Sequence, residues 1–306
     1  MFKRPICFCF VVLLCTLCRG LKAQDITSPR FFKFNYHKLS APNRFISPEG
    51  NTSAKEENGA TYLLETQLFL PISVRGKTLI VSKLEFEHES VFGLQKTFDN
   101  QIDFDFNSFS FQVIGFHSIS EKYKYVSRLK YQIGAEDFFP VSTQAFSYSY
   151  SHVFQKVVKD GEIGLGIQIS YSRRLSFLPL IKYEKGFGNG WGIDLFLPQQ
   201  IFISKQFTQR NKIYAGLTGS RSNYLIRPGL LNENSTYYRR ITVNSIIGFE
   251  KQLNPLFGMM IEGGVTKNLR SGIYTIENRW NRLHNFRDSF EPYLKLGLFM
   301  SVDGLK

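Results

Sequence analysis

Residues 123–133 read YKYVSRLKYQI, and they alternate between two kinds of side chain. One set of alternate positions carries tyrosine, leucine and isoleucine, and the other carries mostly lysine, arginine and glutamine. A period of two is typical of a β-strand, whose successive side chains point to opposite faces of the sheet. In a soluble protein the apolar face would be the core. In a membrane barrel the apolar face meets lipid, and the charged face lines the interior.

The N-terminus has the features of a secretory signal peptide. Lys3 and Arg4 precede an apolar run over residues 6–17, and Ala23 provides a small residue before a cleavage point at Gln24. The run is shorter than the roughly 20 residues that a spanning helix needs. We therefore expect residues 1–23 to be a cleaved signal peptide, and residues 24–306 to form a single barrel domain in the outer membrane of a Gram-negative bacterium.

Cysteine and charge narrow the class of protein further. All four cysteines, Cys7, Cys9, Cys15 and Cys18, lie in the leader, so the mature chain has no disulfide and no thiolate metal site. The leader also holds four of the 38 basic residues, which leaves 34 against 25 acidic residues, an excess of +9. An exported protein rarely meets nucleic acid, so we expect the basic excess to favour outer-membrane lipid and lipopolysaccharide as partners.

Alternating segments broken by turn residues recur along the mature chain. Several reach ten residues or more, whereas strands of globular proteins have a typical length of about 5–6 and membrane-spanning strands need about 9–11. With 30 Phe and 15 Tyr, the composition suits aromatic girdles around a barrel. We expect a first strand over 31–37 and a last over 292–302. The hairpins between them pair 61–71 with 78–88, 107–118 with 123–136, 144–156 with 162–171, 178–185 with 190–197, 201–207 with 212–219, and 240–251 with 257–266.

The connections favour a membrane barrel over a soluble sheet. Turns within the hairpins are short, whereas connections between hairpins are longer, notably 38–59, 89–104, 221–236 and 267–290. Short periplasmic turns with longer extracellular loops are typical of outer-membrane barrels. We predict an all-β fold, an antiparallel transmembrane β-barrel of 14 strands. Twelve strands are the alternative, because the first strand is weak and the turn after Leu197 is short on the side of the long loops.

One long run carries a resemblance to a known family. Residues 175–217 read LSFLPLIKYEKGFGNGWGIDLFLPQQIFISKQFTQRNKIYAGL. They combine a leucine-proline strand, a glycine turn, a strand that begins with tryptophan and ends before proline, and a further hairpin. With its flanks from Tyr123 to Tyr224, the run resembles an uncharacterised family, a domain of unknown function, of predicted outer-membrane β-barrel proteins of Gram-negative bacteria. The resemblance implies a barrel in the outer membrane and supplies no catalytic residues.

Two groups of residues are candidate functional sites. Lys124, Arg128 and Lys130 share the polar face of the opening strand, and Glu136 lies near its outer end, so we expect them to line the lumen and to give an open pore a modest anion preference. The second group is an external basic and aromatic loop suited to a phosphorylated glycolipid. It contains Arg279, Trp280, Arg282 and Arg287.

No catalytic, cofactor-binding or metal-binding residues are predicted. Ser151 and His152 are neighbours in a strand, as are His117 and Ser118, so each pair points to opposite faces and cannot form a local nucleophile–base pair. We expect a porin-like passive channel, or a ligand-binding or structural scaffold, that is folded by the barrel-assembly machinery. Two alternatives stay open: an outer-membrane enzyme acting on lipid or peptide, and a soluble secreted β-protein.

Overall fold

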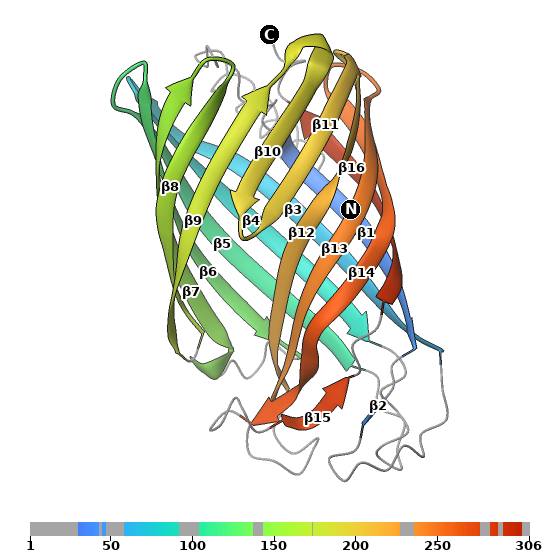
Figure 1. Cartoon of the computed structure of the whole chain (residues 1–306). Helices are drawn as coiled ribbons and strands as arrows, with labels where there is room; N and C mark the ends of the chain where they lie inside the picture. Colours follow the sequence, from blue (N-terminus) through green and yellow to red (C-terminus); the bar gives the residue numbers. More distant parts are fainter. Residues whose placement is uncertain are drawn as a thin grey trace, which may run out of the picture.

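The alternating segments pair into one continuous antiparallel sheet that closes on itself. The computed structural model is a closed barrel of 14 strands (Figure 1). It describes residues 30–42, 45–46, 58–91, 104–136, 143–172, 174–226, 236–275, 282–286 and 290–301. The barrel strands are β1 (Arg30–Pro42), β3 (Asn58–Arg75), β4 (Thr78–Val91), β5 (Phe104–Ser118), β6 (Tyr123–Ala135), β7 (Phe146–Val158), β8 (Gly161–Tyr171), β9 (Leu175–Gly186), β10 (Trp191–Leu197), β11 (Gln200–Thr208), β12 (Asn211–Ile226), β13 (Thr236–Gln252), β14 (Phe257–Thr275) and β16 (Phe290–Ser301).

Closure joins the first strand to the last. β1 pairs with β16 from Arg30 opposite Ser301 to Leu39 opposite Tyr293, and β1 pairs with β3 along its other edge. The predicted first strand is therefore present, and the prediction of 14 strands is confirmed over the alternative of 12. The expected signal peptide lies outside the described residues.

Four short elements accompany the barrel strands. β2 (Phe45–Ile46) and β15 (Arg282–Phe286) pair with each other at the end of the barrel that carries the long connections. Two 3-10 turns, η1 (Thr143–Ala145) and η2 (Gly188–Gly190), precede β7 and β10. Among the described residues, no helix is long and apolar enough to cross a membrane.

Hairpin turns of two to four residues close one end of the barrel, as predicted. They are residues 76–77, 119–122, 159–160, 187–190, 209–210 and 253–256. Gly76, Asp160 and Asn189 adopt the left-handed backbone that such turns need, with φ of 56°, 62° and 63°. We call this the short-turn end and the opposite one the long-loop end.

The outer surface is apolar over the height of the wall. On β8, Ile163, Leu165 and Ile167 are exposed, and Leu165 is 68% exposed. On the opening strand, β6, Tyr123 and Tyr131 are exposed on the apolar face. An apolar surface of this extent belongs to a barrel embedded in lipid, where strands leave no unpaired backbone only if the sheet closes.

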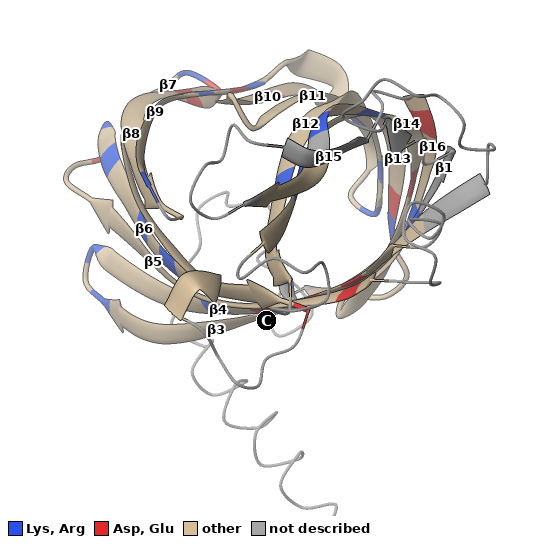
Figure 2. Ribbon diagram, turned by 90° about the horizontal axis from the view of Figure 1, so that it is seen from below, with Lys and Arg blue, Asp and Glu red and all other residues tan. Residues whose placement is uncertain are grey.

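The barrel is not a round tube at its long-loop end, because β12 crosses the interior. Leu225 of β12 pairs with Ala135 of β6 in parallel, and the backbone N–H of Glu136 donates to the Leu225 carbonyl at 2.9 Å. A Cβ on Gly134 would lie 2.7 Å from the carbonyl oxygen of Asn223, so this approach requires glycine. Figure 2, seen from the long-loop end, shows β12 running inside the ring.

This crossing divides the long-loop end into two lobes. The smaller lobe is bounded by β6 to β12 and the larger lobe by β12 to β16, β1 and β3 to β6. The predicted loop over 221–236 is therefore wrong in its first part, because residues 221–226 belong to β12 and pair with β13. The polar stretch Ser220-Arg221-Ser222-Asn223 has the composition of a loop because this half of β12 has left the lipid-facing wall.

The contact between β6 and β12 predicts a specific cross-link. Ala135→Cys with Leu225→Cys places two thiols on directly paired residues, a separation that a disulfide can bridge. Because residues 24–306 contain no native cysteine, oxidation in a chain that begins at Gln24 should give one intramolecular bond, seen as a reducible shift in gel mobility.

The matched control combines Ala135→Cys with Leu217→Cys, which faces outward eight residues earlier on β12 and pairs with Ile201 and Ser245 instead. Equal oxidation of both pairs, or of neither, would contradict the crossing.

Candidate functional site

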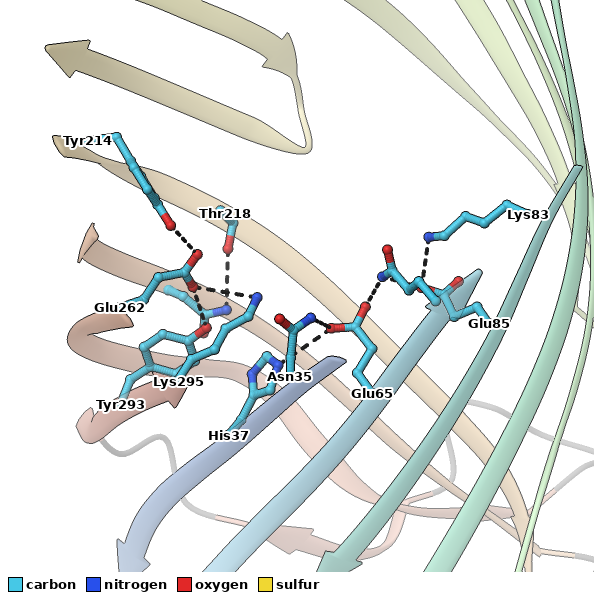
Figure 3. Close-up of polar contacts among 12 residues, drawn as sticks. Asn35, His37, Glu65, Lys83, Glu85, Tyr214, Thr218, Glu262, Tyr293 and Lys295 are labelled. Carbon is cyan, nitrogen blue, oxygen red and sulfur yellow. Dashed lines mark hydrogen bonds and ion pairs between the residues drawn. The ribbon is translucent and has the colours of Figure 1, made fainter. Parts of the chain in front are cut away.

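The interior of the barrel carries a chain of polar side chains that begins on β12. The Tyr214 hydroxyl donates to Glu262 on β14 at 2.6 Å, and the Tyr293 hydroxyl on β16 donates to the other oxygen of the same carboxylate at 2.9 Å. The Lys295 ammonium lies 3.5 Å from Glu262 (Figure 3). One buried carboxylate thus collects three donors from two other strands.

Tyr214 reaches Glu262 by lying across the strand between them. A Cβ on Gly248 of β13 would stand 2.3 Å from the Tyr214 ring, so the ring occupies the space that any side chain at 248 would need. The inward position of Gly248 is therefore part of the polar chain, although it contributes no polar atom.

The chain continues around the wall through β1 and β3. The Asn35 amide donates to Glu65 at 2.7 Å, and the His37 ring nitrogen lies 3.5 Å from the same carboxylate. Gln67 donates to Glu65 and also to Glu85 on β4, the latter at 2.8 Å. Figure 3 shows Asn35, His37, Glu65 and Glu85 projecting from adjacent strands into the interior.

Glu85 is the second buried carboxylate that collects several donors. Ser110 and Gln112 of β5 each donate to it at 3.1 Å. The ammonium of Lys83 donates at 2.9 Å, and that of Lys130 on β6 lies 3.6 Å away. From β12 to β6 the interior is thus lined by a polar belt, which comprises Tyr214, Glu262, Tyr293, Lys295, Asn35, His37, Glu65, Gln67, Lys83, Glu85, Ser110, Gln112 and Lys130.

Three carboxylates of this wall lie close enough together to ligate a cation. Oxygens of Glu65, Glu85 and Glu87 come within 4.8 Å of one another. Glu65 and Glu85, however, already accept hydrogen bonds from the amides and ammonium groups of the belt. Side chains of this protein thus already bind the oxygens of two of the three carboxylates, and we assign no metal to them.

The larger lobe is filled at its long-loop end by apolar and aromatic side chains. The Phe106 ring of β5 stacks on Tyr224 of β12 at 4.8 Å and on Tyr238 of β13 at 4.9 Å between ring centroids. We call this group the outer aromatic cluster. It consists of Val91, Phe104, Phe106, Tyr224, Ile226, Tyr238 and Ile273.

A buried ion pair ties the outer aromatic cluster to the wall. Glu89 of β4 is fully buried, and its carboxylate lies 2.9 Å from the guanidinium of Arg240 on β13. The Tyr224 hydroxyl donates to Glu89 at 3.1 Å. The cluster and this pair join β4 and β5 to β12 and β13 across the interior, so they constrict the larger lobe.

The structure places the four lumen candidates of the opening strand as follows. Lys124 donates to Glu162 on β8 at 2.8 Å, and Lys130 belongs to the polar belt. Arg128 lies between them, with a buried Nε that has no hydrogen-bond partner among the described residues. Glu136 directly follows β6 and contributes the backbone N–H that bonds β12.

The external loop candidates fall largely outside the described part of the chain. Arg279, Trp280 and Arg287 lie outside the described residues, and the side chain of Arg282 does as well. The backbone of Arg282 belongs to β15, opposite Tyr274 of β14.

The histidines considered for catalysis contact neutral partners. His117 shares a hydrogen bond of 2.8 Å with Thr78, and His152 lies 3.4 Å from the Tyr150 hydroxyl. Within the described part of the chain, neither imidazole is paired with a carboxylate, which is the partner that would orient a catalytic base.

Sequence reasoning missed the residues that matter most in the interior. Glu89, Arg240, Glu262 and Tyr293 were given no role, although each lies on an alternating strand. Register is the missing information, because a carboxylate and its donor can lie far apart along the chain: Glu89 and Tyr224 are separated by 135 residues. The available signal was strand alternation, since Glu262 and Tyr293 alternate with outward apolar residues such as Ile261 and Leu294.

A closed antiparallel sheet with an apolar outer face and a polar inner face defines a transmembrane β-barrel of the outer-membrane class. No family model and no curated protein matches the chain. It is similar to an outer-membrane channel from Pseudomonas putida F1 at 7% identity, with a TM-score of 0.49 over 91% of this chain and 98% of that one.

Two further solved structures are also similar to the chain. The NanC porin matches at 9% identity and a TM-score of 0.39, over 88% of this chain and 99% of that one. The translocator domain of the autotransporter NalP from Neisseria meningitidis matches at 10% identity and a TM-score of 0.39, over 96% of this chain and 95% of that one.

The position of Gly248 gives a test of the polar belt. Gly248→Ala puts a methyl group where the Tyr214 ring lies, so the ring must leave Glu262, and we expect a loss of about 1–3 kcal/mol in unfolding free energy. Urea unfolding of the refolded barrel, followed by heat-modifiable gel migration, measures the change. Gly263→Ala on β14 is the control, because its Cβ would meet nothing closer than 4.0 Å. Equal stability of the two variants would contradict the arrangement.

The buried ion pair of the outer aromatic cluster gives a second test. Glu89→Leu leaves the Arg240 guanidinium buried without its carboxylate, and we expect a loss of about 3–5 kcal/mol. The double variant Glu89→Leu with Arg240→Met removes both charges and should recover most of the loss in the same unfolding assay. A double variant as unstable as the single one would show that the pair is not the cause.

Proposed function

We propose that the protein is a passive, narrow channel of the outer membrane. The observation that carries the proposal is the polar belt, a lining of charged and hydrogen-bonding side chains inside a barrel whose outside is apolar. A barrel with a purely structural role could fill its interior with apolar side chains, whereas a lining of this kind offers water and polar solutes the partners they need.

The polar belt lines the undivided lumen nearer the short-turn end, and the constriction of the larger lobe directs the proposed path from there into the smaller lobe. The outer aromatic cluster occupies the larger lobe at the long-loop end, between β4, β5 and the β12–β14 strands. In the smaller lobe, Lys124 and Lys182 flank Glu162 at 2.8 and 2.7 Å near the short-turn end. A polar pocket lies at its long-loop end, lined by Gln132, Gln144, Ser147, Ser172, Arg221 and Asn223.

Charge pairing refines the expected ion preference. Lys124 and Lys130, proposed here to line the path, each have a carboxylate within 3.6 Å, which offsets much of their field. Arg128, whose Nε has no partner in the described part of the chain, is the cation best placed to interact with a passing anion. The proposed channel therefore has a weak anion preference, with Glu136 near the outer end of the same strand.

The cellular setting follows from the same proposal. Residues 1–23 direct export and are cleaved, the barrel-assembly machinery inserts the chain, and the surrounding lipid includes lipopolysaccharide. Arg279, Trp280, Arg282 and Arg287 would contact its phosphate groups from the long-loop end. Membership of the uncharacterised outer-membrane family that residues 175–217 resemble is part of this proposal, as is the lack of catalytic activity.

A planar-bilayer experiment tests the channel. We expect small conductance steps with a weak anion preference, read from the reversal potential in a salt gradient. Glu162→Gln removes the carboxylate between Lys124 and Lys182 and should shift the reversal potential further toward anions. Glu121→Gln makes the same change of charge in an exposed turn and should leave the potential close to that of the unaltered protein.

Either of two results would contradict this proposal. A protein that is correctly folded in the bilayer but carries no current is not a channel. Equal shifts for Glu162→Gln and Glu121→Gln would mean that ions do not pass Glu162.

A further inference from the structure

The wall of the smaller lobe is incomplete at one place. β10 and β11 have 7 and 9 residues, whereas their outer neighbours β9 and β12 have 12 and 16. The hairpin turn of β10 and β11 at residues 198–199 therefore ends part of the way along the barrel, while β9 and β12 continue toward the long-loop end (Figure 1).

Two strand edges are left without partners beyond that turn. β9 pairs with β10 only from Ile181 to Gly186, so residues 175–180 pair with β8 alone. β12 pairs with β11 only as far as Thr218, and among the described residues 220–224 pair with β13 alone. At roughly 3.3 Å per residue, the free edge of β9 is about 20 Å long. Pro179 lies within it, as suits a strand edge. We call the space between these edges the notch.

The notch lies within the part of the wall that faces lipid. Phe177 and Leu175 on the free edge are 62% and 57% exposed, and they pair with Ile169 and Tyr171 of β8. Tyr171 stacks on Tyr148 of β7 at 5.1 Å, an aromatic pair of the kind that lies at the membrane interface. The free edge thus runs from the interface into the apolar zone of the outer leaflet.

Unpaired backbone at this depth has a physical implication. Hydrocarbon offers no hydrogen bonds, so unpaired strand edges are tolerated only where they line a cavity that admits water or polar groups. On β12, the outward side chains change at this point from Ile213, Ala215 and Leu217 to Gly219 and Arg221. The outward face of β12 is therefore suited to lipid over residues 213–217 and to a polar environment from residue 219 onward, along the notch.

The lining of the notch combines apolar and polar surfaces. On the inner face of β9, Leu178 and Leu180 replace the charged Lys182 and Glu184 found nearer the short-turn end. Across from them, Arg221 and Asn223 of β12 belong to the polar pocket. An apolar wall on one side and a guanidinium on the other match a molecule with an apolar chain and an anionic head.

We propose that the notch is a lateral opening through which an amphiphile, with a hydrocarbon chain and a carboxylate-like head, passes between the smaller lobe and the outer leaflet. The chain lies against Leu178, and the head is bound by Arg221. This inference rests on the proposed channel and names its class of substrate.

Fluorescence quenching tests whether the notch is open to lipid. Since the mature chain has no cysteine, Leu178→Cys introduces a unique thiol on the inner face at the notch. This thiol is labelled with bimane, and the protein is reconstituted into phosphatidylcholine vesicles. Ser151→Cys is the matched control, because Ser151 faces inward at the same level, two strands away in the continuous wall. Phe177→Cys places the bimane on the lipid-facing side and gives the quenching expected for full exposure to lipid.

Two quenchers distinguish a lipid acyl chain from a free amphiphile as the source of the hydrocarbon chain in the notch. With phosphatidylcholine carrying a nitroxide on its acyl chain, and with nitroxide-labelled stearate, we expect bimane at position 178 to be quenched nearly as strongly as at 177, and several-fold more than at 151. Arg221→Gln should raise the stearate concentration for half-quenching several-fold and leave quenching by phosphatidylcholine unchanged.

Each contrary result removes a defined part of the inference. Quenching at position 178 no greater than at 151 means that the notch is closed. Quenching by phosphatidylcholine but not by stearate means that a lipid chain seals the notch and nothing passes. An unchanged response of Arg221→Gln overturns the role of Arg221 in binding the head. None of these readouts requires ion current, so failure of the lateral opening is distinguishable from failure of the channel.

Discussion

Backbone hydrogen bonding in a medium without water is the constraint on which this structure depends. Every strand that crosses hydrocarbon must satisfy its N–H and C=O groups along both edges, and a sheet does so only by closing. The pairing of β1 with β16 supplies that closure. Once the sheet is closed, alternation assigns one side of each strand to lipid and the other to the interior. The two free edges beside the β10–β11 hairpin are a place in the described wall where this rule is relaxed.

Glycine shapes the interior as much as the charged residues do. A closed barrel holds its inward side chains at the spacing of the strands, about 4.8 Å, so a buried carboxylate reaches donors two strands away only if the strand between them has nothing in the way. Gly248 leaves that room for Tyr214, and Gly258 leaves it for the Phe299 ring. The Arg30 guanidinium lies 4.2 Å from the centroid of the Phe299 ring and forms an ion pair with Glu250. The polar belt is therefore a product of small and large residues placed in register.

Much of the fold could be predicted from the sequence, because strand alternation and turn residues are local signals. All of the predicted strands are present, and YKYVSRLKYQI has its tyrosines outside. The error at 221–226 arose because a strand that enters the interior loses its apolar face and so resembles a loop. The interior contacts were beyond sequence reasoning for a different reason. Strand alternation places the side chains of Glu89 and Arg240 on the inner face, but only the closed sheet and the path of β12 bring them together.

The bridge between β6 and β12 has a consequence for the shape that the barrel can keep. β6 and β12 both belong to the closed wall, so the hydrogen bond between them ties together two points of the ring with five strands between them. With this tie in place, the long-loop end cannot become circular without breaking the backbone bond from Glu136 to Leu225. The width of the barrel at this end is thus set by one interior contact as well as by the number of strands.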